Sequence, residues 1–152
     1  MATASAADQK MHDVATGGAE GKRRAGIIDV NGSEVIVTTL QAGDATNFPQ
    51  TGQSVRIHYV ATLADGSQFD SSRVRDQAIN FRLGGGMVLA GLEAAVRTMS
   101  RGQLAKIAIP PDAGYGAAGF PPIVPPNATL FYEVELISFA NVEEGIQVNP
   151  LK

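Results

Sequence analysis

Two residue types that often carry out covalent chemistry, cysteine and histidine, are missing or scarce in this chain. The 152 residues include no cysteine and two histidines, His12 and His58. Thiol catalysis, disulfides and thiolate metal sites are therefore excluded. The G-x-S-x-G motif of serine hydrolases is absent, and His58 falls on the polar face of an alternating segment, where we expect a surface residue. We therefore expect neither a metal nor a cofactor.

One glycine pattern is typical of phosphate-binding loops. Gly114, Gly116 and Gly119 match the G-x-G-x-x-G spacing of dinucleotide-binding proteins. That motif needs a helix to begin on it, so that the helix N-terminal amides face the pyrophosphate. Pro121-Pro122 and Pro125-Pro126 follow instead, and a helix does not continue through such prolines. We therefore do not expect a dinucleotide site.

The same glycines belong to a long segment, residues 110–127, which holds six of the eight prolines of the chain. Loops of this length are usually functional or disordered. This one contains large apolar side chains that a disordered linker seldom contains, namely Tyr115, Phe120, Ile123 and Val124. We predict that the segment folds over a binding site and forms one of its walls.

Composition excludes several classes of partner. The net charge is −3, which gives no broad basic surface for nucleic acid. No apolar run approaches the roughly 18 residues of a membrane helix, and the N-terminus lacks the apolar core of a signal peptide. The hydrophobic fraction of 44% suffices for the core of one domain. We expect a monomeric, cytoplasmic protein with no nucleic-acid or membrane partner.

Alternation of apolar and polar residues predicts the strands that would position such a site. In residues 54–63, Val55, Ile57 and Tyr59 face one way, while Arg56 faces the other. Similar patterns occur at residues 68–70, 79–83, 103–109 and 128–139. The sequence therefore predicts an antiparallel sheet of about five strands with one buried face.

The ends of the chain differ from its middle. Asn31-Gly32 lies between β-branched runs and predicts a hairpin, because a type I′ turn needs positive φ at both central residues. We assign residues 25–34 to this hairpin as an extra edge strand. Residues 1–24 are small and polar, which predicts a disordered N-terminal tail. Residues 141–152 form a second tail, and one domain spans residues 35–140.

One helix is predicted, over residues 87–100. Val88, Leu92 and Met99 recur on one face at helical spacing. Glu93 and Arg97 stand four residues apart in the order that favours an ion pair. A single apolar stripe must pack against the sheet, so the fold class is α+β, with the sheet wrapped around one short helix.

The buried face would carry many aromatic residues and one carboxylate. Its apolar members are Tyr59, Phe69, Ile79, Phe81, Val88, Leu89, Leu92 and Tyr132, and the long segment adds Tyr115. Such residues form either an ordinary core or an apolar ligand pocket with a few polar groups. Asp70 beside Phe69 favours the pocket, since a carboxylate in a core needs a partner.

These residues occur in a recognisable order. The motifs are Phe69-Asp70-Ser71-Ser72, Leu83-Gly84, Met99 to Gln103, Tyr115-Gly116-Ala117 and Ile123 to Leu130. In order and spacing they resemble the FKBP-type peptidyl-prolyl cis-trans isomerases, which are immunophilins that bind the macrolides tacrolimus and rapamycin. The resemblance extends without gaps from about Val35 to Phe139, which is most of the chain.

The resemblance implies a curved antiparallel sheet around one helix, with residues 110–127 as a flap over the pocket. It implies proline-containing peptides and proteins as substrates, and both macrolides as inhibitors. It assigns Asp70 and Tyr115 to catalysis, and it makes the Leu89 N–H a hydrogen-bond donor to the ligand. The implied pocket positions are Tyr59, Phe69, Arg75, Ile79, Phe81, Met87, Val88, Leu89, Leu92, Phe120, Ile123, Val124 and Tyr132, with Arg75 paired to Asp70.

Four positions depart from the family pattern. The pocket floor is usually Trp and here is Leu92, so we expect weaker macrolide binding and reduced isomerase efficiency. Ile79 stands where an aromatic residue is common, and Phe120 stands at the variable tip of the flap. Met87, with three glycines before it, replaces a more polar stretch. The alternative function is a weakly active binding module that keeps the fold as a scaffold.

Overall fold

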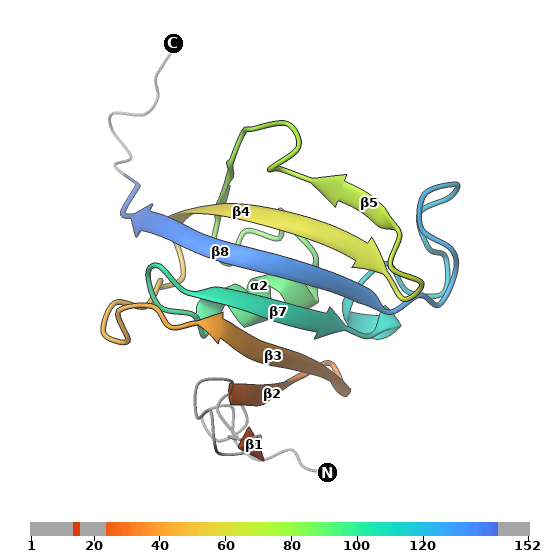
Figure 1. The fold of residues 1–152 in the computed structure, drawn as a ribbon, viewed down its shortest axis with the longest axis horizontal. Helices are drawn as coiled ribbons and strands as arrows, with labels where there is room; N and C mark the ends of the chain where they lie inside the picture. The colour runs from red at the N-terminus through yellow and green to blue at the C-terminus, as the bar shows by residue number, and fades with distance from the viewer. Residues whose placement is uncertain (1–13, 16–23, 143–152) are drawn as a thin grey trace.

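The computed structural model describes residues 14–15 and 24–142 of the chain. These residues form eight strands, one α-helix and one 3-10 helix (Figure 1). The strands are β1 (Val14–Ala15), β2 (Arg24–Val30), β3 (Ser33–Gln41), β4 (Ser54–Leu63), β5 (Gln68–Ser71), β6 (Ile79–Arg82), β7 (Leu104–Ile109) and β8 (Leu130–Ala140). The helices are α2 (Ala90–Arg97) and the 3-10 helix η1 (Pro111–Ala113).

All the strands belong to one antiparallel sheet in the order β1-β2-β3-β7-β8-β4-β5, with β6 also paired to β4. The long strands β4 and β8 pair along their whole length at the centre. The other edge of β4 is shared between β6, which pairs with Ser54–Ile57, and β5, which pairs with Val60–Thr62. His58 and Tyr59 therefore lie where one partner strand ends and the other begins.

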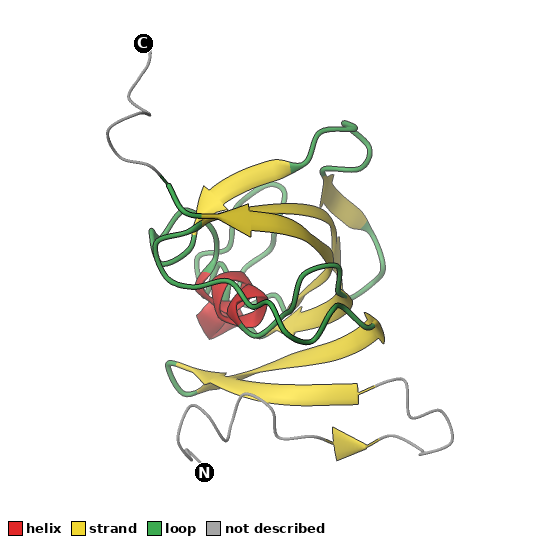
Figure 2. Ribbon diagram, turned by 90° about the vertical axis from the view of Figure 1, so that its left-hand side faces the viewer, coloured by secondary structure: helices red, strands yellow, loops and turns green. Residues whose placement is uncertain are grey.

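The sheet curves around α2, which lies on its concave face (Figure 2). Inward residues of β4 and β8 alternate with outward ones, as their sequence pattern predicts. The core contains Val55, Ile57, Ala61, Leu130, Val134 and Leu136 from the central strands, Ile107 and Ile109 from β7, and Leu92, Ala95 and Val96 from α2. The predicted α+β architecture, a curved antiparallel sheet around one short helix, is confirmed.

The predicted hairpin is also present. β2 and β3 pair from Ala25↔Thr38 to Val30↔Ser33, and φ is 53° at Asn31 and 87° at Gly32. β2 adds a further strand beyond β3, and β1 pairs with the beginning of β2. The sheet therefore has three strands more than the alternation pattern alone predicts. Two of them, β2 and β3, are the arms of the predicted hairpin, and the third, β1, has only two residues, too few for a periodic signal.

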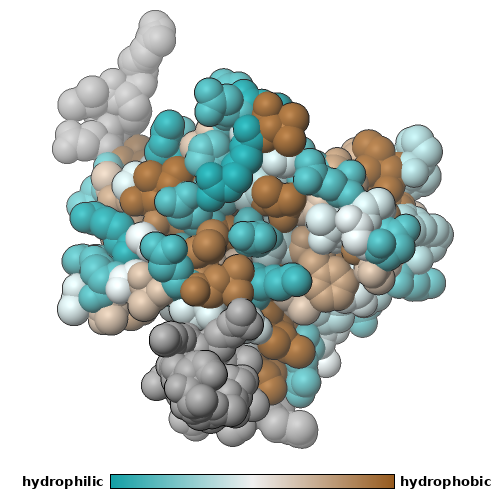
Figure 3. Space-filling view, viewed as in Figure 1, coloured by the Kyte–Doolittle hydropathy of each residue, from teal (hydrophilic) through white to brown (hydrophobic). Residues whose placement is uncertain are grey.

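The outer face of the sheet, which faces the viewer in Figures 1 and 3, is mixed in character. Hydrophilic and hydrophobic residues are interspersed across it (Figure 3). Arg56, Lys106 and Glu133 are exposed there on alternate positions of their strands. Such a solvated face leaves the concave side, with its helix and loops, as the place for a binding site.

Two local expectations need correction. The helix occupies Ala90–Arg97 rather than residues 87–100, so Val88 and Leu89 lie in the loop before it. The predicted ion pair between Glu93 and Arg97 is not formed. Glu93 is on the buried face of α2, and its carboxylate accepts a hydrogen bond from the Gly84 N–H. Arg97 instead donates to the Thr51 hydroxyl over 2.6 Å.

The flap also has more regular structure than its sequence indicates. It begins with η1 and contains one isolated bridge between Phe120 and Val124. No helix begins on the Gly114 to Gly119 motif in this described segment.

Most of the two predicted tails, residues 1–13, 16–23 and 143–152, lies outside the described residues. Val14–Ala15 and Arg24, which the sequence assigns to the N-terminal tail, belong to strands β1 and β2. Among the described helices, none is long and apolar enough to cross a membrane.

Candidate active site

The candidate site lies on the concave side, between β5, the N-terminal end of α2 and the flap. Its deepest residues are buried, and they are Tyr59, Phe81, Leu92, Val124 and Tyr132. A second group is partly buried and packs against that core, namely Phe69, Ile79, Val88, Leu89 and Tyr115. The predicted apolar pocket residues therefore come together from five separate elements and the flap, although they are far apart in the sequence.

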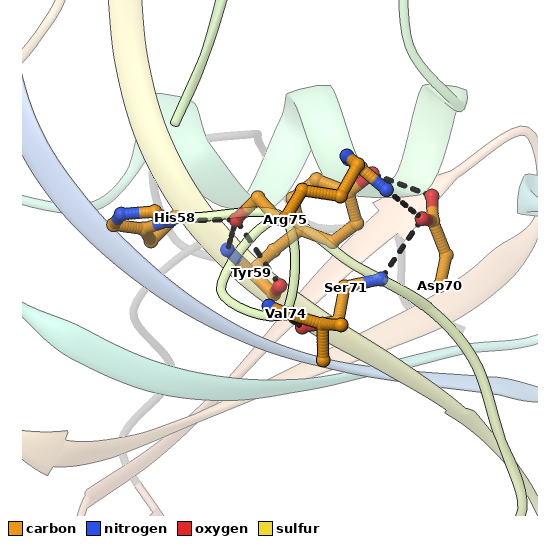
Figure 4. A network of polar contacts seen from close by, with 7 residues as sticks. His58, Tyr59, Asp70, Ser71, Val74 and Arg75 are labelled. Carbon is orange, nitrogen blue, oxygen red and sulfur yellow. Dashed lines mark hydrogen bonds and ion pairs between the residues drawn. The ribbon is translucent and has the colours of Figure 1, made fainter. Parts of the chain in front are cut away.

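Asp70 is held by a hydrogen-bonded network (Figure 4). Its carboxylate accepts a hydrogen bond from the Tyr59 hydroxyl over 2.5 Å and from the Arg75 guanidinium over 2.6 Å. Arg75 also approaches the Tyr59 oxygen at 3.2 Å, and the Ser71 N–H donates to the carboxylate over 2.8 Å. The resulting triangle fixes the carboxylate against the buried Tyr59 and compensates for the part of its charge that is removed from water.

The network shifts the protonation of its members in opposite directions. Burial by itself would raise the pKa of the Asp70 carboxyl, but the hydrogen bonds from Tyr59 and Arg75 outweigh it and lower the pKa. Burial, together with the bond to Asp70, raises the pKa of the Tyr59 phenol. Asp70 therefore stays ionised and Tyr59 stays protonated near neutral pH, which suits a fixed electrostatic group rather than a proton-transfer pair.

Sequence reasoning missed the residue that fixes Tyr59. The hydroxyl of Ser72 accepts a hydrogen bond from the Tyr59 N–H over 2.7 Å, and the Ser72 N–H donates to the Tyr59 carbonyl over 3.0 Å. Ser72 is fully buried. It replaces the strand partner that β4 lacks between β5 and β6, because the chain leaves β5 at this point.

The surface position predicted for His58 also needs correction. His58 is half-buried, and its Nδ1 lies 2.8 Å from the Ser72 hydroxyl (Figure 4). The alternation pattern puts His58 on the outer face, but the loop after β5 covers that part of the strand. The signal that was available is the serine pair after Asp70, since serine hydroxyls often replace missing backbone partners.

Aromatic rings form the wall next to this network. The ring of Tyr132 lies 5.7 Å from the ring of Tyr59 and 6.2 Å from that of Phe69, measured between centroids. The contact with Phe69 is edge-to-face, with an interplanar angle of 87°. Such packing is favourable for aromatic quadrupoles, and it joins β4, β5 and β8 into one rigid surface.

The start of α2 presents an unused backbone donor. Leu89 is the N-cap residue, with no side-chain cap, and its carbonyl accepts the first helical hydrogen bond, from Glu93. Within residues 24–142, no hydrogen bond occupies the Leu89 N–H. The bond from Gly84 to the buried Glu93 ties the preceding glycine loop to α2 and so positions Leu89, a role that the sequence did not indicate.

The flap is ordered by its own hydrogen bonds. The Gly116 N–H donates to the Pro111 carbonyl over 2.8 Å, and the Asn127 N–H donates to the Gly116 carbonyl over 2.9 Å. These bonds bring the two ends of the flap together. The ring of Tyr115 stacks on that of Phe120, with centroids 5.3 Å apart and an interplanar angle of 17°. The Tyr115 hydroxyl has no hydrogen-bond partner among the described residues.

Three predicted site residues lie at the rim instead of the floor. Met87 is 62% exposed, Phe120 is 51% exposed and Ile123 is 46% exposed. Phe120 reaches the site through its stack on Tyr115, while Met87 accepts a long hydrogen bond of 3.4 Å from the Arg82 N–H. These residues surround the site with apolar surface, but they do not belong to its buried wall.

The chain is similar to known proteins over the same region. Residues 45–137 match the family model described as FKBP-type peptidyl-prolyl cis-trans isomerase. The chain is 50% identical to FK506-binding protein 1A of Emericella nidulans over 103 residues, which is 68% of this chain and 95% of that protein. It is 48% identical to FK506-binding protein 1 of Rhizopus delemar over 103 residues, again 68% of this chain and 95% of that protein.

A third relative matches over nearly the same length. FK506-binding protein 1 of Dictyostelium discoideum is 47% identical over 105 residues, which is 69% of this chain and 97% of that protein. The matched segment includes the Asp70 network, the start of α2 and the flap. The fold, the family model and these relatives agree that the chain belongs to the FKBP-type peptidyl-prolyl cis-trans isomerases, enzymes that rotate the peptide bond before proline.

Proposed function

We propose that this site binds proline-containing segments of peptides and proteins, rotates their X–Pro bonds and thereby assists folding. One observation carries the proposal. The Leu89 N–H and the Tyr115 hydroxyl are polar groups beside an apolar wall, and no described residue satisfies either of them. Groups of this kind are available to hold the backbone carbonyls of a ligand. The catalytic domain is proposed to span residues 35–140.

Rotation of an X–Pro bond requires neither a nucleophile nor a metal. The barrier is about 18–20 kcal/mol because resonance gives the amide partial double-bond character, and unassisted rotation takes tens to hundreds of seconds. The twisted transition state has lost this resonance, and its carbonyl is less dipolar. A dry apolar site therefore favours the transition state over the planar amide, which is differential binding.

Each group of residues has a proposed part in this reaction. Phe69, Phe81, Val88 and Leu92 supply apolar surface for the proline ring, and the Leu89 N–H and the Tyr115 hydroxyl hold the flanking backbone. Asp70 acts as a fixed negative charge and an anchor for Tyr59, because its ionised form is stabilised by Tyr59 and Arg75. Proton transfer is not part of the proposal.

Macrolide binding is proposed on two grounds. The relatives are named for binding FK506, and this chain brings apolar and aromatic side chains together with two polar groups that have no partner among the described residues. Leu92 occupies the floor position, and its side chain is almost fully buried. Leucine lacks the flat ring and the indole donor of tryptophan, so we propose that tacrolimus and rapamycin bind less tightly here than to a site with a tryptophan floor.

The alternative is a weakly active binding module, and the observation that favours it is also Leu92. An isomerisation assay on a short Leu-Pro peptide separates the two functions. We expect a rate well above that in buffer, with inhibition by tacrolimus. A rate equal to that in buffer, together with measurable peptide binding, would favour the binding module.

The substitution Leu92→Trp tests the floor. We expect tighter tacrolimus binding by calorimetry, because the indole adds apolar contact and a donor. Overpacking of a core position costs about 1–3 kcal/mol, so the free energy of unfolding should be measured on the same variant. Unchanged or weaker binding by a folded variant would show that Leu92 does not face the ligand.

We also propose that the protein is a monomer in the cytoplasm. Sedimentation equilibrium should give a mass near the 15.8 kDa of the chain, and a fluorescent fusion should stay in the cytoplasm. A concentration-dependent dimer would contradict the monomer.

A further inference from the structure

Tyr132 combines deep burial with a polar group. The residue is 5% exposed and lies on the inner face of β8. Its ring packs between those of Tyr59 and Phe69. Burial is the main cause that raises the pKa of its phenol, and the charges of Tyr115, Tyr59 and Asp70 add to the effect. The phenol therefore stays protonated near neutral pH and keeps its hydrogen to donate.

The hydroxyl of Tyr132 has no hydrogen-bond partner in the described part of the chain, residues 14–15 and 24–142. A buried hydroxyl usually finds a partner, since leaving one unsatisfied is unfavourable. A phenylalanine would fill the same space without this cost. An unsatisfied donor next to a binding site is expected where a ligand supplies the acceptor.

The neighbouring Tyr59 provides a direct contrast. Its hydroxyl donates to Asp70 over 2.5 Å and lies 3.2 Å from Arg75, so it is fully engaged within the protein (Figure 4). The two phenols are thus diagonal neighbours on adjacent strands β4 and β8, with their ring centroids 5.7 Å apart. One is committed to holding the carboxylate, and the other is left with its donor unused.

We propose that the Tyr132 hydroxyl is a specificity-determining donor, which hydrogen-bonds a carbonyl oxygen of the bound proline-containing segment. This inference rests on the proposed function of the site. It adds a third ligand-facing donor, on β8, to the Leu89 N–H and the Tyr115 hydroxyl. The three donors come from the sheet, the helix start and the flap, so together they fix the orientation of the ligand backbone from three sides.

A site with a buried hydroxyl discriminates by chemistry as well as by shape. A ligand that presents a carbonyl toward β8 accepts a hydrogen bond from this hydroxyl. A purely apolar ligand leaves the hydroxyl buried and unpaired, which weakens binding. We therefore expect this isomerase to prefer peptide segments with a free backbone carbonyl at this depth over apolar groups of the same size.

The substitution Tyr132→Phe tests the proposal on the full chain with a Leu-Pro tetrapeptide. We expect KM, and the dissociation constant measured by calorimetry, to rise about three- to tenfold, as for the loss of one hydrogen bond, with a smaller change in kcat. The melting temperature should be unchanged or higher, because an unsatisfied hydroxyl is removed from the free protein.

The matched control is Tyr59→Phe, the same chemical change on the neighbouring ring. This variant should melt at a lower temperature, because Asp70 and Arg75 lose a partner. An active wild type with an unchanged KM in Tyr132→Phe would overturn the role of Tyr132 alone. A lower melting temperature in Tyr132→Phe would also overturn it, because the hydroxyl would then have a partner within the protein. A wild type that neither isomerises nor binds the peptide would overturn the proposed function itself.

Discussion

The two sides of the candidate site treat their polar groups in opposite ways. On the β5 side, the oxygens of Tyr59 and Asp70 and the Tyr59 N–H are all engaged by Arg75, Ser71 or Ser72. On the side of α2 and the flap, the Leu89 N–H and the Tyr115 hydroxyl have no partner among the described residues.

The difference distinguishes groups that stabilise the fold from groups that are available to a ligand. Groups bonded within the protein contribute to folding and keep the carboxylate in place, but they have little capacity left for a ligand. Buried groups without partners lower the stability of the free protein, and a ligand that bonds them restores the lost free energy in the complex. Substitutions on the β5 side should therefore affect stability and activity together, while those on the flap side should affect activity alone.

The largest effect is expected for Asp70→Ala. The change leaves the buried Tyr59 hydroxyl without its acceptor and Arg75 without its ion pair. We expect about 1–3 kcal/mol less free energy of unfolding in urea, and a fall in kcat/KM of about tenfold. The matched control is Asp65→Ala in the exposed turn after β4, which should keep full activity. Normal stability of Asp70→Ala would break the distinction between the two sides.

A smaller and purely functional effect is expected for Tyr115→Phe. The variant keeps the ring and its stack on Phe120 but loses the free hydroxyl. We expect kcat/KM to fall about three- to tenfold, as for one lost hydrogen bond in the complex, with an unchanged melting temperature. A clear loss of stability would mean that this hydroxyl supports the flap, in which case it would belong with the β5 side.

The dependence of stability on pH should follow the carboxylate. The folded pKa of Asp70 is lowered, below the usual value of about 3.9. Its contribution to stability is therefore complete above that pH and is lost as the pH falls through the folded pKa. In urea titrations, the advantage of the wild type over Asp70→Asn should be constant from neutral pH to about pH 5 and shrink below pH 4. A constant difference at all pH values would argue against an ionised Asp70.

The smallest effect is expected for Arg75→Gln. Arg75 and Asp70 form an ion pair of 2.6 Å, but their side chains are 46% and 38% exposed. Exposed pairs contribute only about 0.2–1 kcal/mol, so the loss of stability should be within that range and should decrease in high salt. A loss as large as that of Asp70→Ala would show that Arg75, and not Tyr59, is the main partner of the carboxylate.

Much of this molecule follows from its sequence. The alternation in residues 54–63 and 130–140 determines which side chains of β4 and β8 are buried, because successive strand residues point to opposite faces. Asn31-Gly32 specifies its turn by its backbone conformation. The motifs around Asp70 and Tyr115 identify the family. In each case the information lies within a few consecutive residues.

Other features were decided by contacts between distant segments. The length of α2 could not be read from its apolar stripe, because Met87 to Leu89 continue the stripe but adopt a loop that the bond between Glu93 and Gly84 holds in place. Ser72 becomes essential only because β5 and β6 leave a gap along β4. These interactions join residues whose separation in the chain has no periodic pattern.

Tyr132 shows the same division within one residue. The sequence by itself places its ring on the inner face of β8, since Leu130, Tyr132 and Val134 alternate with Phe131 and Glu133. Whether its hydroxyl has a partner depends on which groups β4, β5 and the flap bring near it. Local pattern therefore determines the direction of a side chain, and only the tertiary structure decides which polar groups are satisfied and which are left for a ligand.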